Sequence, residues 1–202
     1  MFVFSYVIPH DYGFAPNPYG GFLTLATCKP KIRKTATKGD FIVGTGSAST
    51  VGNDKLVYAA KISDVVSMAD YGRLAKYKIK RPSMNGPLSK RHGDNIYFFE
   101  DDVWHQRANT FHGIDCLERD LSGLNVLICD RFWYFGDNAI DIPRQHRAII
   151  KRGPGHKKLS DDAITIPFIR WLDSLPCGNH NGADTESDTQ ITNRCTCVLE
   201  MS

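Results

Sequence analysis

Alternation of apolar and polar residues along the chain predicts a series of short strands. Each apolar run is bounded by Gly, Pro, Asn or Asp, the residues that favour turns. In the longest run, Leu56, Tyr58, Ala60 and Ile62 fall on one face of a strand. The expected strands are 2–8, 22–26, 41–46, 55–66, 95–99 and 124–130.

Three other segments favour helices. Ser67 followed by Asp70 has the form of a helix cap and predicts a short amphipathic helix to about residue 77. Pro143 suits the first position of a short helix that ends near residue 153, and a last helix is expected over 167–175. Residues 78–93 are basic and contain two prolines and two glycines, which predicts a mobile loop.

These elements together predict the α+β class. Short strands with a few inserted helices fit a small curved sheet or a partly open β-barrel. We expect one domain over residues 1–176 and a polar C-terminal extension over 177–202, where the hydrophobic periodicity ends.

Composition places the chain among soluble globular proteins. Of its 202 residues, 42% are hydrophobic and 23% are charged, and no apolar run reaches the roughly 20 residues that cross a bilayer. The apolar start lacks the basic residues of a signal peptide, so we expect a cytoplasmic protein without a membrane partner. The acidic extension leaves the rest of the chain with a formal charge of +6, which permits a polyanionic partner.

The clearest electrostatic feature is the basic decapeptide 29–38. In an extended conformation, Lys29, Lys31 and Arg33 would share one face and could neutralise neighbouring phosphates, with Lys34 close by. The alternative is a solvated edge strand, where lysines discourage pairing between sheets.

Two further segments have both a binding and a structural interpretation. The stretch from Gly44 through Gly46 and Ser47 lacks the lysine of a phosphate-binding loop, yet its backbone could approach an anion or a base edge; otherwise it is a tight turn. The aromatic run 132–135 would alternate between two faces, and Tyr134 could stack on a base unless both faces are buried.

The histidines and cysteines offer candidate chemistry without a recognised motif. His10 and Asp11 form a candidate acid–base pair, and His105 and His112, near Asp115 and Cys116, have ligand-type side chains at a spacing unlike a zinc site. In each case a structural role is the simpler interpretation. Four zinc-type ligands also lie in the C-terminal extension, namely Cys177, His180, Cys195 and Cys197. The spacing of Cys195 and Cys197 is not the usual spacing of ligands in a zinc knuckle, so we expect neither a metal nor a cofactor.

Several segments, in order from about residue 2 to residue 175, resemble a bacterial and phage family, the nucleotide modification associated domain, second type. They are S-Y-V-I-P-H-D-Y-G-F-A-P-N-P, L-A-T-C-K-P-K-I-R-K-T-A, G-D-F-I-V-G-T-G-S, K-L-V-Y-A-A-K-I, D-N-I-Y, F-W-Y-F-G and G-P-G-H-K, which start at residues 5, 25, 39, 55, 94, 132 and 153. The resemblance stops short of the residues after Pro176. It implies a role in DNA base modification or in conflict between phage and host, and it carries over no catalytic residues.

A second likeness concerns the fold. Gly39 and Asp40 before a strand, a loop of small residues and a second strand are similar to the PUA-related barrels, including the ASCH and EVE domains. Those domains hold a base or an RNA element in a cleft, so the likeness implies a PUA-like sheet or barrel.

Two functions follow from these expectations. The first is recognition of a modified base or nucleotide in nucleic acid, with the basic residues above on phosphate and others in the cleft. The residues expected to bind are Lys29, Lys31, Arg33, Lys34, Tyr6, His10, Gly46, Ser47, Tyr134, His156 and Lys157. The alternative is an enzyme acting on nucleotides or modified bases, with His10, Asp11, His105 or His156 as acid or base and Lys157 on a phosphate. The sequence leaves open which modified base is bound, whether DNA, RNA or a free nucleotide is the partner, and the oligomeric state.

Overall fold

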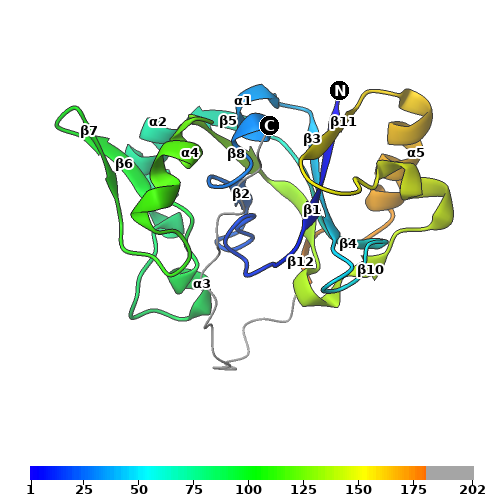
Figure 1. The fold of residues 1–202 in the computed structure, drawn as a ribbon, viewed down its shortest axis with the longest axis horizontal. Helices are drawn as coiled ribbons and strands as arrows, with labels where there is room; N and C mark the ends of the chain where they lie inside the picture. Colours follow the sequence, from blue (N-terminus) through cyan, green and yellow to red (C-terminus); the bar gives the residue numbers. More distant parts are fainter. Residues whose placement is uncertain (181–202) are drawn as a thin grey trace. The chain divides into compact units, whose positions relative to one another are not determined.

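The computed structural model describes residues 1–180, which form two compact units (Figure 1). The large-sheet unit comprises residues 1–11, 36–64 and 129 onward, and the small-sheet unit comprises residues 12–35 and 65–128. Each unit has its own buried hydrophobic cluster. The units are therefore assembled from stretches that are far apart in the sequence.

The large-sheet unit is built on a seven-stranded sheet. Its strand order is β11 (His156–Leu159), β1 (Val3–Ile8), β3 (Phe41–Gly46), β4 (Lys55–Lys61), β9 (Arg131–Tyr134) and β12 (Gly178–Asn179), and β10 (Ile140–Asp141) also pairs with β4. The central strands β1 and β3 run parallel, and each pairs antiparallel with its other neighbour. Strands near the N-terminus and near the C-terminus thus lie side by side (Figure 1).

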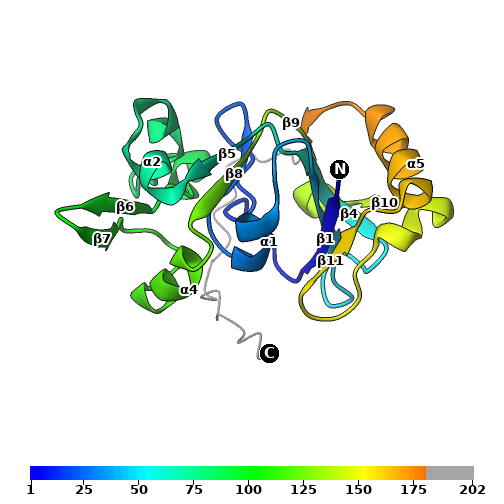
Figure 2. The same ribbon diagram turned by 90° about the horizontal axis from the view of Figure 1, so that it is seen from above.

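Helix α5 (Asp162–Asp173) covers part of this sheet (Figure 2). The side chain of Asp161 caps it by accepting a hydrogen bond from the Ala163 amide at 2.9 Å. Phe168 and Leu172 on its inner face join the strands' buried hydrophobic cluster. Two short 3-10 helices, η3 (Gly136–Asn138) and η4 (Arg144–Ile149), complete the unit.

The small-sheet unit combines a three-stranded sheet with short helices. The sheet has the order β2 (Leu23–Leu25), β8 (Asn125–Cys129) and β5 (Asp64–Ser67), the last beginning one residue before the unit. A separate hairpin, β6 (Tyr97–Glu100) and β7 (Val103–Gln106), extends away from the rest of the unit (Figures 1 and 2). The helical elements are α1 (Pro30–Thr35), α2 (Met68–Arg73), η1 (Ala75–Lys80), α3 (Leu88–Arg91), η2 (Ile114–Cys116) and α4 (Leu117–Leu121).

Buried polar groups tie the segments of the small-sheet unit together. The carboxylate of Asp94 accepts hydrogen bonds from Thr24 and Tyr71, each at 2.6 Å, and burial raises the pKa of this carboxyl. The Lys80 ammonium is 1% exposed and donates to two oxygens of Asn17 at 2.8 and 3.1 Å and to the Phe22 carbonyl at 2.6 Å. These bonds hold the Pro- and Gly-rich segment of residues 12–22 in place.

Several local predictions are confirmed. The strands expected at 2–8, 22–26, 41–46 and 124–130 are β1, β2, β3 and β8 to within one residue at either end. Ser67 caps α2, because its Oγ accepts a hydrogen bond from the Asp70 amide at 3.0 Å. The strand expected at 95–99 is displaced to β6 at Tyr97–Glu100.

Other local predictions are wrong. The expected strand 55–66 is two strands, β4 and β5, and the helix from Ser67 ends at Arg73 and is followed by η1. The expected loop 78–93 contains the end of η1 and all of α3. A short helix does follow Pro143, but it is the 3-10 helix η4, which ends at Ile149 and not near residue 153. The last helix begins at Asp162, before Pro167, because Asp161 supplies its cap.

The α+β class is confirmed, and within residues 1–180 the sheets are open and form no closed barrel. At the start of the polar extension expected from residue 177, β12 pairs with β9 at Gly178 and Asn179, and the extent of the extension stays a prediction. Residues 181–202 lie outside the described structure, and a single domain over 1–176 stays a prediction. Within the described part of the chain, none of the helices has the length and apolarity needed to span a bilayer.

Candidate active site

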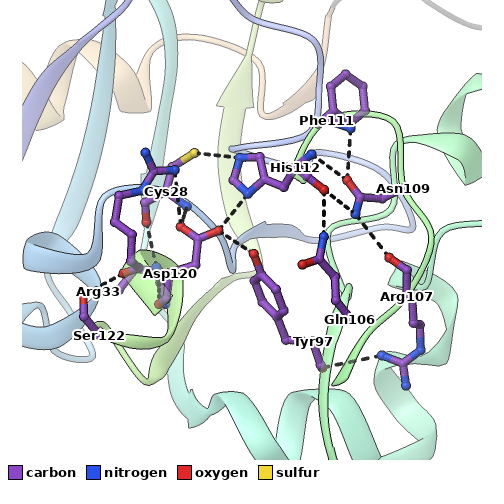
Figure 3. Close-up of polar contacts among 11 residues, drawn as sticks. Cys28, Arg33, Tyr97, Gln106, Arg107, Asn109, Phe111, His112, Asp120 and Ser122 are labelled. Carbon is purple, nitrogen blue, oxygen red and sulfur yellow. Dashed lines mark hydrogen bonds and ion pairs between the residues drawn. The ribbon is translucent and has the colours of Figure 1, made fainter. Parts of the chain in front are cut away.

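A cysteine, a histidine and an aspartate stand in a row in the small-sheet unit (Figure 3). The Cys28 sulfur lies 3.4 Å from Nε2 of His112, and Nδ1 of the same ring lies 2.7 Å from Oδ2 of Asp120. His112 and Asp120 are 4% and 0% exposed, whereas Cys28 is partly exposed. The three ligand-type atoms lie within 4.8 Å of one another, so the residues form a compact cluster, which we call the row because His112 contacts both of the others.

Cys28 occupies a strained turn between β2 and α1. Its φ is 54° and that of Lys29 is 41°, a left-handed conformation that residues other than glycine adopt at a cost of about 1–3 kcal/mol. Pro30 then begins α1 with its φ already suited to a helix. A nucleophile on a tight strand-to-helix turn projects away from the strand that carries it, and serine hydrolases use the same device.

The buried guanidinium of Arg33 holds this turn in place. Its Nε donates to the Cys28 carbonyl at 2.8 Å, and its two terminal nitrogens donate to the carbonyls of Asn125 at 2.7 Å and Asp120 at 2.5 Å. Gly123 makes the close approach possible, because a Cβ there would lie 2.8 Å from Cα of Pro30 and 3.0 Å from Cζ of Arg33. Arg33 thus links α1, β8 and the end of α4.

Both oxygens of Asp120 have partners. Oδ1 accepts a hydrogen bond from the Cys28 amide at 2.9 Å, and Oδ2 accepts from the Tyr97 hydroxyl at 3.0 Å as well as from His112. Burial by itself would raise the pKa of this carboxyl, but the hydrogen bond and charge of His112, with the charge of Arg33, lower it below its ordinary value. Asp120 therefore remains a carboxylate inside the unit.

The segment before His112 fixes the orientation of its ring. Asn109 Oδ1 accepts a hydrogen bond from the His112 amide at 2.7 Å, and the side-chain amides of Gln106 and Asn109 donate to the His112 carbonyl at 2.7 and 3.1 Å (Figure 3). Phe14 packs edge-on against the imidazole, with ring centroids 5.0 Å apart. The ring is thus held with one nitrogen toward Cys28 and the other toward Asp120.

This setting keeps His112 protonated at neutral pH. Burial opposes the charge, but hydrogen bonds to Asp120 and Cys28 outweigh it and raise the pKa of His112 to about 10. An imidazolium beside a thiol stabilises the thiolate, which is the nucleophilic form of cysteine. The arrangement is that of a nucleophile, an acid–base group and an orienting carboxylate.

The same three residues have metal-ligand atoms within 4.8 Å of one another. Their hydrogen bonds do not favour a metal, because a ligating carboxylate needs a free oxygen lone pair directed to the ion. Here both oxygens of Asp120 already accept hydrogen bonds, Oδ1 from the Cys28 amide and Oδ2 from the Tyr97 hydroxyl and His112. The row fits proton transfer and nucleophilic attack better than metal binding.

Aromatic rings line the His112 side of the row. Phe111 stacks on Phe14 at 4.7 Å between centroids, Tyr12 stacks on Phe111 at 5.9 Å, and His92 meets Phe111 edge-on at 4.8 Å. Phe14 and Phe111 are buried, and Tyr12 is partly exposed. We call Tyr12, Phe14, His92 and Phe111 the aromatic wall.

The basic decapeptide is not extended, and that prediction is wrong. Residues 30–35 form α1, which leaves Lys31 and Lys34 exposed and Lys29 partly exposed. Arg33 is 0% exposed and its guanidinium bonds to backbone carbonyls inside the unit, so it does not face a phosphate. Burial of Arg33 against β8 and α4 favours a helix here, and the local sequence pattern did not predict this burial.

Six of the other candidate residues in the large-sheet unit are Tyr6, His10, Asp11, Gly46, Ser47 and Tyr134. The hydroxyls of Tyr6 and Tyr58 meet at 2.6 Å inside it, and Tyr134 is 1% exposed, so neither tyrosine presents a free ring face. Gly46 is also buried. Ser47 is partly exposed and bonds to Ser49 at 3.0 Å between hydroxyl oxygens, and His10 is exposed with Asp11 partly buried beside it in sequence.

The remaining candidate catalytic residues have other contacts. His156 packs near Phe4, with ring centroids 6.0 Å apart, and Nζ of Lys157 donates to the Ala148 carbonyl at 2.7 Å. In the small-sheet unit, exposed His105 on β7 stacks on Phe98 at 5.0 Å.

The cysteine and histidine ligands expected in the C-terminal extension are only partly described. Cys177 is exposed, and His180 stacks on Phe135 and has Nε2 2.7 Å from the Pro176 carbonyl oxygen. Cys195 and Cys197 lie outside the described residues. Nearer the site, His112 pairs with Cys28 and Asp120, whereas Cys116 is buried on η2 and Asp115 is exposed.

Sequence reasoning missed Cys28 and Asp120. The available signal was the break between a short apolar run and a proline at T-C-K-P, which is typical of a strand-to-helix turn. Cys28 and His112 are 84 positions apart, so no spacing rule could pair them.

Comparison with known proteins gave one match. The family model described as nucleotide modification associated domain 2 matches residues 1–189. The match runs past Pro176, where the sequence resemblance was expected to end. No curated protein and no solved structure matches the chain.

Proposed function

The chain belongs to the nucleotide modification associated domain 2 family, and on this premise we propose that it is a thiol-dependent enzyme. Its substrate is a nucleotide or a modified base, and Cys28 is the nucleophile. Recognition of the base is the first step of the reaction. The protein is linked to nucleotide modification through its family, and the catalytic role is our proposal.

One observation carries the proposal: the row from the Cys28 sulfur through His112 to Asp120, at 3.4 and 2.7 Å. The thiol is partly exposed and stands on a left-handed turn that Arg33 and Asp120 hold in place. A structural cysteine needs neither a strained backbone nor an imidazolium at its sulfur. Strain of this kind is commonly found where chemistry takes place.

The roles of the three residues follow from the geometry. The Cys28 thiolate attacks an electrophilic carbon of the substrate and forms a carbon–sulfur bond. His112 donates its Nε2 proton to the leaving group, then removes a proton from the water or second substrate that breaks the carbon–sulfur bond. The thiolate leaves with its electron pair, and the imidazolium is restored. Asp120 orients the ring and stabilises its charge throughout.

Finer expectations from the sequence remain proposals. Lys31 and Lys34, exposed on the helix that follows Cys28, are the decapeptide residues we propose for substrate phosphate, together with Lys29. A PUA-like arrangement of the sheets and a bacterial or phage origin are proposed on the resemblances alone, and a cytoplasmic location is proposed from the sequence.

The test combines thiol labelling with turnover. Iodoacetamide should alkylate Cys28 faster than an ordinary exposed thiol, and His112→Ala should slow this at least about tenfold. Peptide mass spectrometry separates Cys28 from exposed Cys177, whose labelling provides the internal control.

Turnover is sought by mass analysis of nucleotides and oligonucleotides, with and without base modifications, after incubation with the protein. Cys28→Ala should lower product formation by at least about a thousandfold, or ~4 kcal/mol of transition-state stabilisation. Cys177→Ser should leave it unchanged. Undiminished turnover by Cys28→Ala, or specific binding with every strand recovered intact, would contradict the proposal and favour a module that only recognises a modified base.

A further inference from the structure

A strongly basic segment of the small-sheet unit lies outside the row. Between Asp70 and Asp94 the sequence has no acidic residue. We call residues 73–91 the basic segment; its cationic residues are Arg73, Lys76, Lys78, Lys80, Arg81, Lys90 and Arg91. Such a density of one charge raises the local concentration of polyanions.

These cations do not all have the same role. Lys80 is buried and bonds to Asn17 and Phe22, so it belongs to the core of the unit. Arg73 forms an ion pair with Asp70 at 2.8 Å. Lys76 and Lys78 on η1 and Lys90 on α3 are exposed, and Nζ of Lys76 lies 4.7 Å from the centre of the Tyr77 ring. The three lysines are the positions at which an external anion would be met.

The basic segment folds back on itself between η1 and α3. The Ser83 amide donates to the Lys90 carbonyl at 2.9 Å, and the Asn95 amide donates to the Lys80 carbonyl at 3.0 Å. Gly93 approaches so closely that a Cβ there would lie 2.4 Å from the Lys80 carbonyl oxygen. The end of η1 therefore lies next to the residues that follow α3.

A continuous chain of contacts connects this segment with the candidate active site. His92 directly follows Arg91, and its carbonyl accepts a hydrogen bond from the Asn17 side chain at 2.7 Å. Its ring meets Phe111 at 4.8 Å, Phe111 stacks on Phe14 at 4.7 Å, and Phe14 meets His112 at 5.0 Å between centroids. The basic segment and Cys28 thus belong to one packed unit, joined through the aromatic wall.

From these observations we infer that the substrate is carried on a nucleic-acid strand and that the basic segment binds its phosphate backbone. The inference rests on the proposed function and selects a strand over a free nucleotide. Lysines distributed along a segment match a polymer of regularly spaced phosphates, whereas a single nucleotide would engage only one of them. Tyr12, which stacks on Phe111 and is partly exposed, offers an aromatic ring on which a base of the strand could stack.

The experiment measures binding separately from chemistry. The full chain carrying Cys28→Ser is titrated into a fluorescent single-stranded DNA oligonucleotide at several salt concentrations, and anisotropy reports the dissociation constant. The test variant adds Lys76→Gln, Lys78→Gln and Lys90→Gln. The matched control adds Lys38→Gln, Lys61→Gln and Arg170→Gln, three exposed cations of the large-sheet unit.

We expect the test variant to bind at least about tenfold more weakly at low salt, and the control to stay within about twofold. The slope of log affinity against log salt should decrease by about 2, since each lost phosphate contact on a single strand contributes about 0.7. A nucleoside monophosphate should compete poorly with the strand. Thermal unfolding must match between the two variants, which shows that a loss of affinity is not a loss of fold.

Three outcomes would overturn the inference. They are equal affinity and salt slope in the two triple variants, tighter binding of the monophosphate than of the strand, and lysine-dependent binding to phosphatidylserine vesicles without strand binding. None of these touches the thiol-dependent chemistry, which depends on the alkylation of Cys28 in the wild-type chain. Conversely, an unreactive Cys28 in a protein that binds strands would refute the proposed function first.

Discussion

Each unit buries an apolar cluster, but the small-sheet unit also encloses Arg33, Lys80, Asp94 and Asp120, whereas the large-sheet unit encloses Asp40. In the first, Val3, Trp133 and Phe168 are typical of the core. In the second, Asp120 and the charged residues around it are enclosed together with apolar rings. A buried charge costs several kcal/mol unless it is paired and hydrogen-bonded, so hydrophobic burial alone would not select such a core.

The difference shows what each core is for. An apolar cluster fills space and stabilises a sheet without specifying the direction of any one bond. The charged groups of the small-sheet unit instead fix a backbone turn, a ring orientation and a protonation state around Cys28. We infer that the protein bears the free-energy cost of burying these charges because they position the Cys28 thiol.

The most severe test of this comparison is removal of one carboxylate from each unit. Asp120→Ala leaves Arg33 and His112 as buried cations without their carboxylate, and we expect a loss of about 3–5 kcal/mol in the free energy of unfolding. Asp173→Ala in the large-sheet unit breaks a partly exposed ion pair with Arg131 and should cost about 0–1 kcal/mol. Urea unfolding followed by circular dichroism measures both. Similar losses of unfolding free energy in the two variants would show that the buried charges stabilise the fold no more than an exposed ion pair does.

A smaller effect distinguishes the buried histidines of the two units by pH. The pKa of His112 is raised to about 10, so its contribution to stability is complete below the unfolded pKa of about 6.5 and is lost as pH rises toward 10. Burial lowers the pKa of His146, so its contribution is complete above about 6.5 and is lost as pH falls through the lowered value.

The two histidines therefore predict opposite slopes. His112→Asn should flatten the decline in unfolding free energy above about pH 7, a decline of at most about 1.4 kcal/mol per pH unit for one proton. His146→Phe should flatten the decline on the acid side, below about pH 6.5. Denaturant titrations from pH 5 to 9 provide the measurement, with each variant serving as the control for the other. If His112→Asn kept the wild-type slope above pH 7, the protonated imidazolium would be excluded.

The smallest expected effect concerns helix caps, where the two units should behave alike. Ser67 caps α2 and Asp161 caps α5, each through one hydrogen bond to a backbone amide. Ser67→Ala and Asp161→Ala should each lower the unfolding free energy by about 1 kcal/mol. Alkylation of Cys28 should be unaffected in both, so a change confined to Ser67→Ala would indicate that α2 supports the site.

Local pattern predicted the elements that depend only on nearby residues. The strands β1, β3 and β8 follow from apolar runs bounded by turn residues, and the α2 cap follows from a hydroxyl three positions before an acidic residue. The pattern failed where a distant contact outweighed it. Residues 30–35 alternate in a way that fits a strand, yet burial of the Arg33 guanidinium against three carbonyls stabilises a helix.

The family resemblance was also readable in the sequence, because its motifs are contiguous, and it is confirmed over residues 1–189. The candidate active site was not. Each of its residues is unremarkable in its own segment, and the histidine was noticed only as a metal-ligand candidate beside Asp115 and Cys116. Cys28 is 84 positions from His112 and 92 from Asp120. Only the packing of β2, α1 and α4 brings the thiol, the imidazole and the carboxylate together. A hydrogen bond of about 3 Å requires groups that are neighbours in space, and here the tertiary fold makes them neighbours although they are far apart in the sequence.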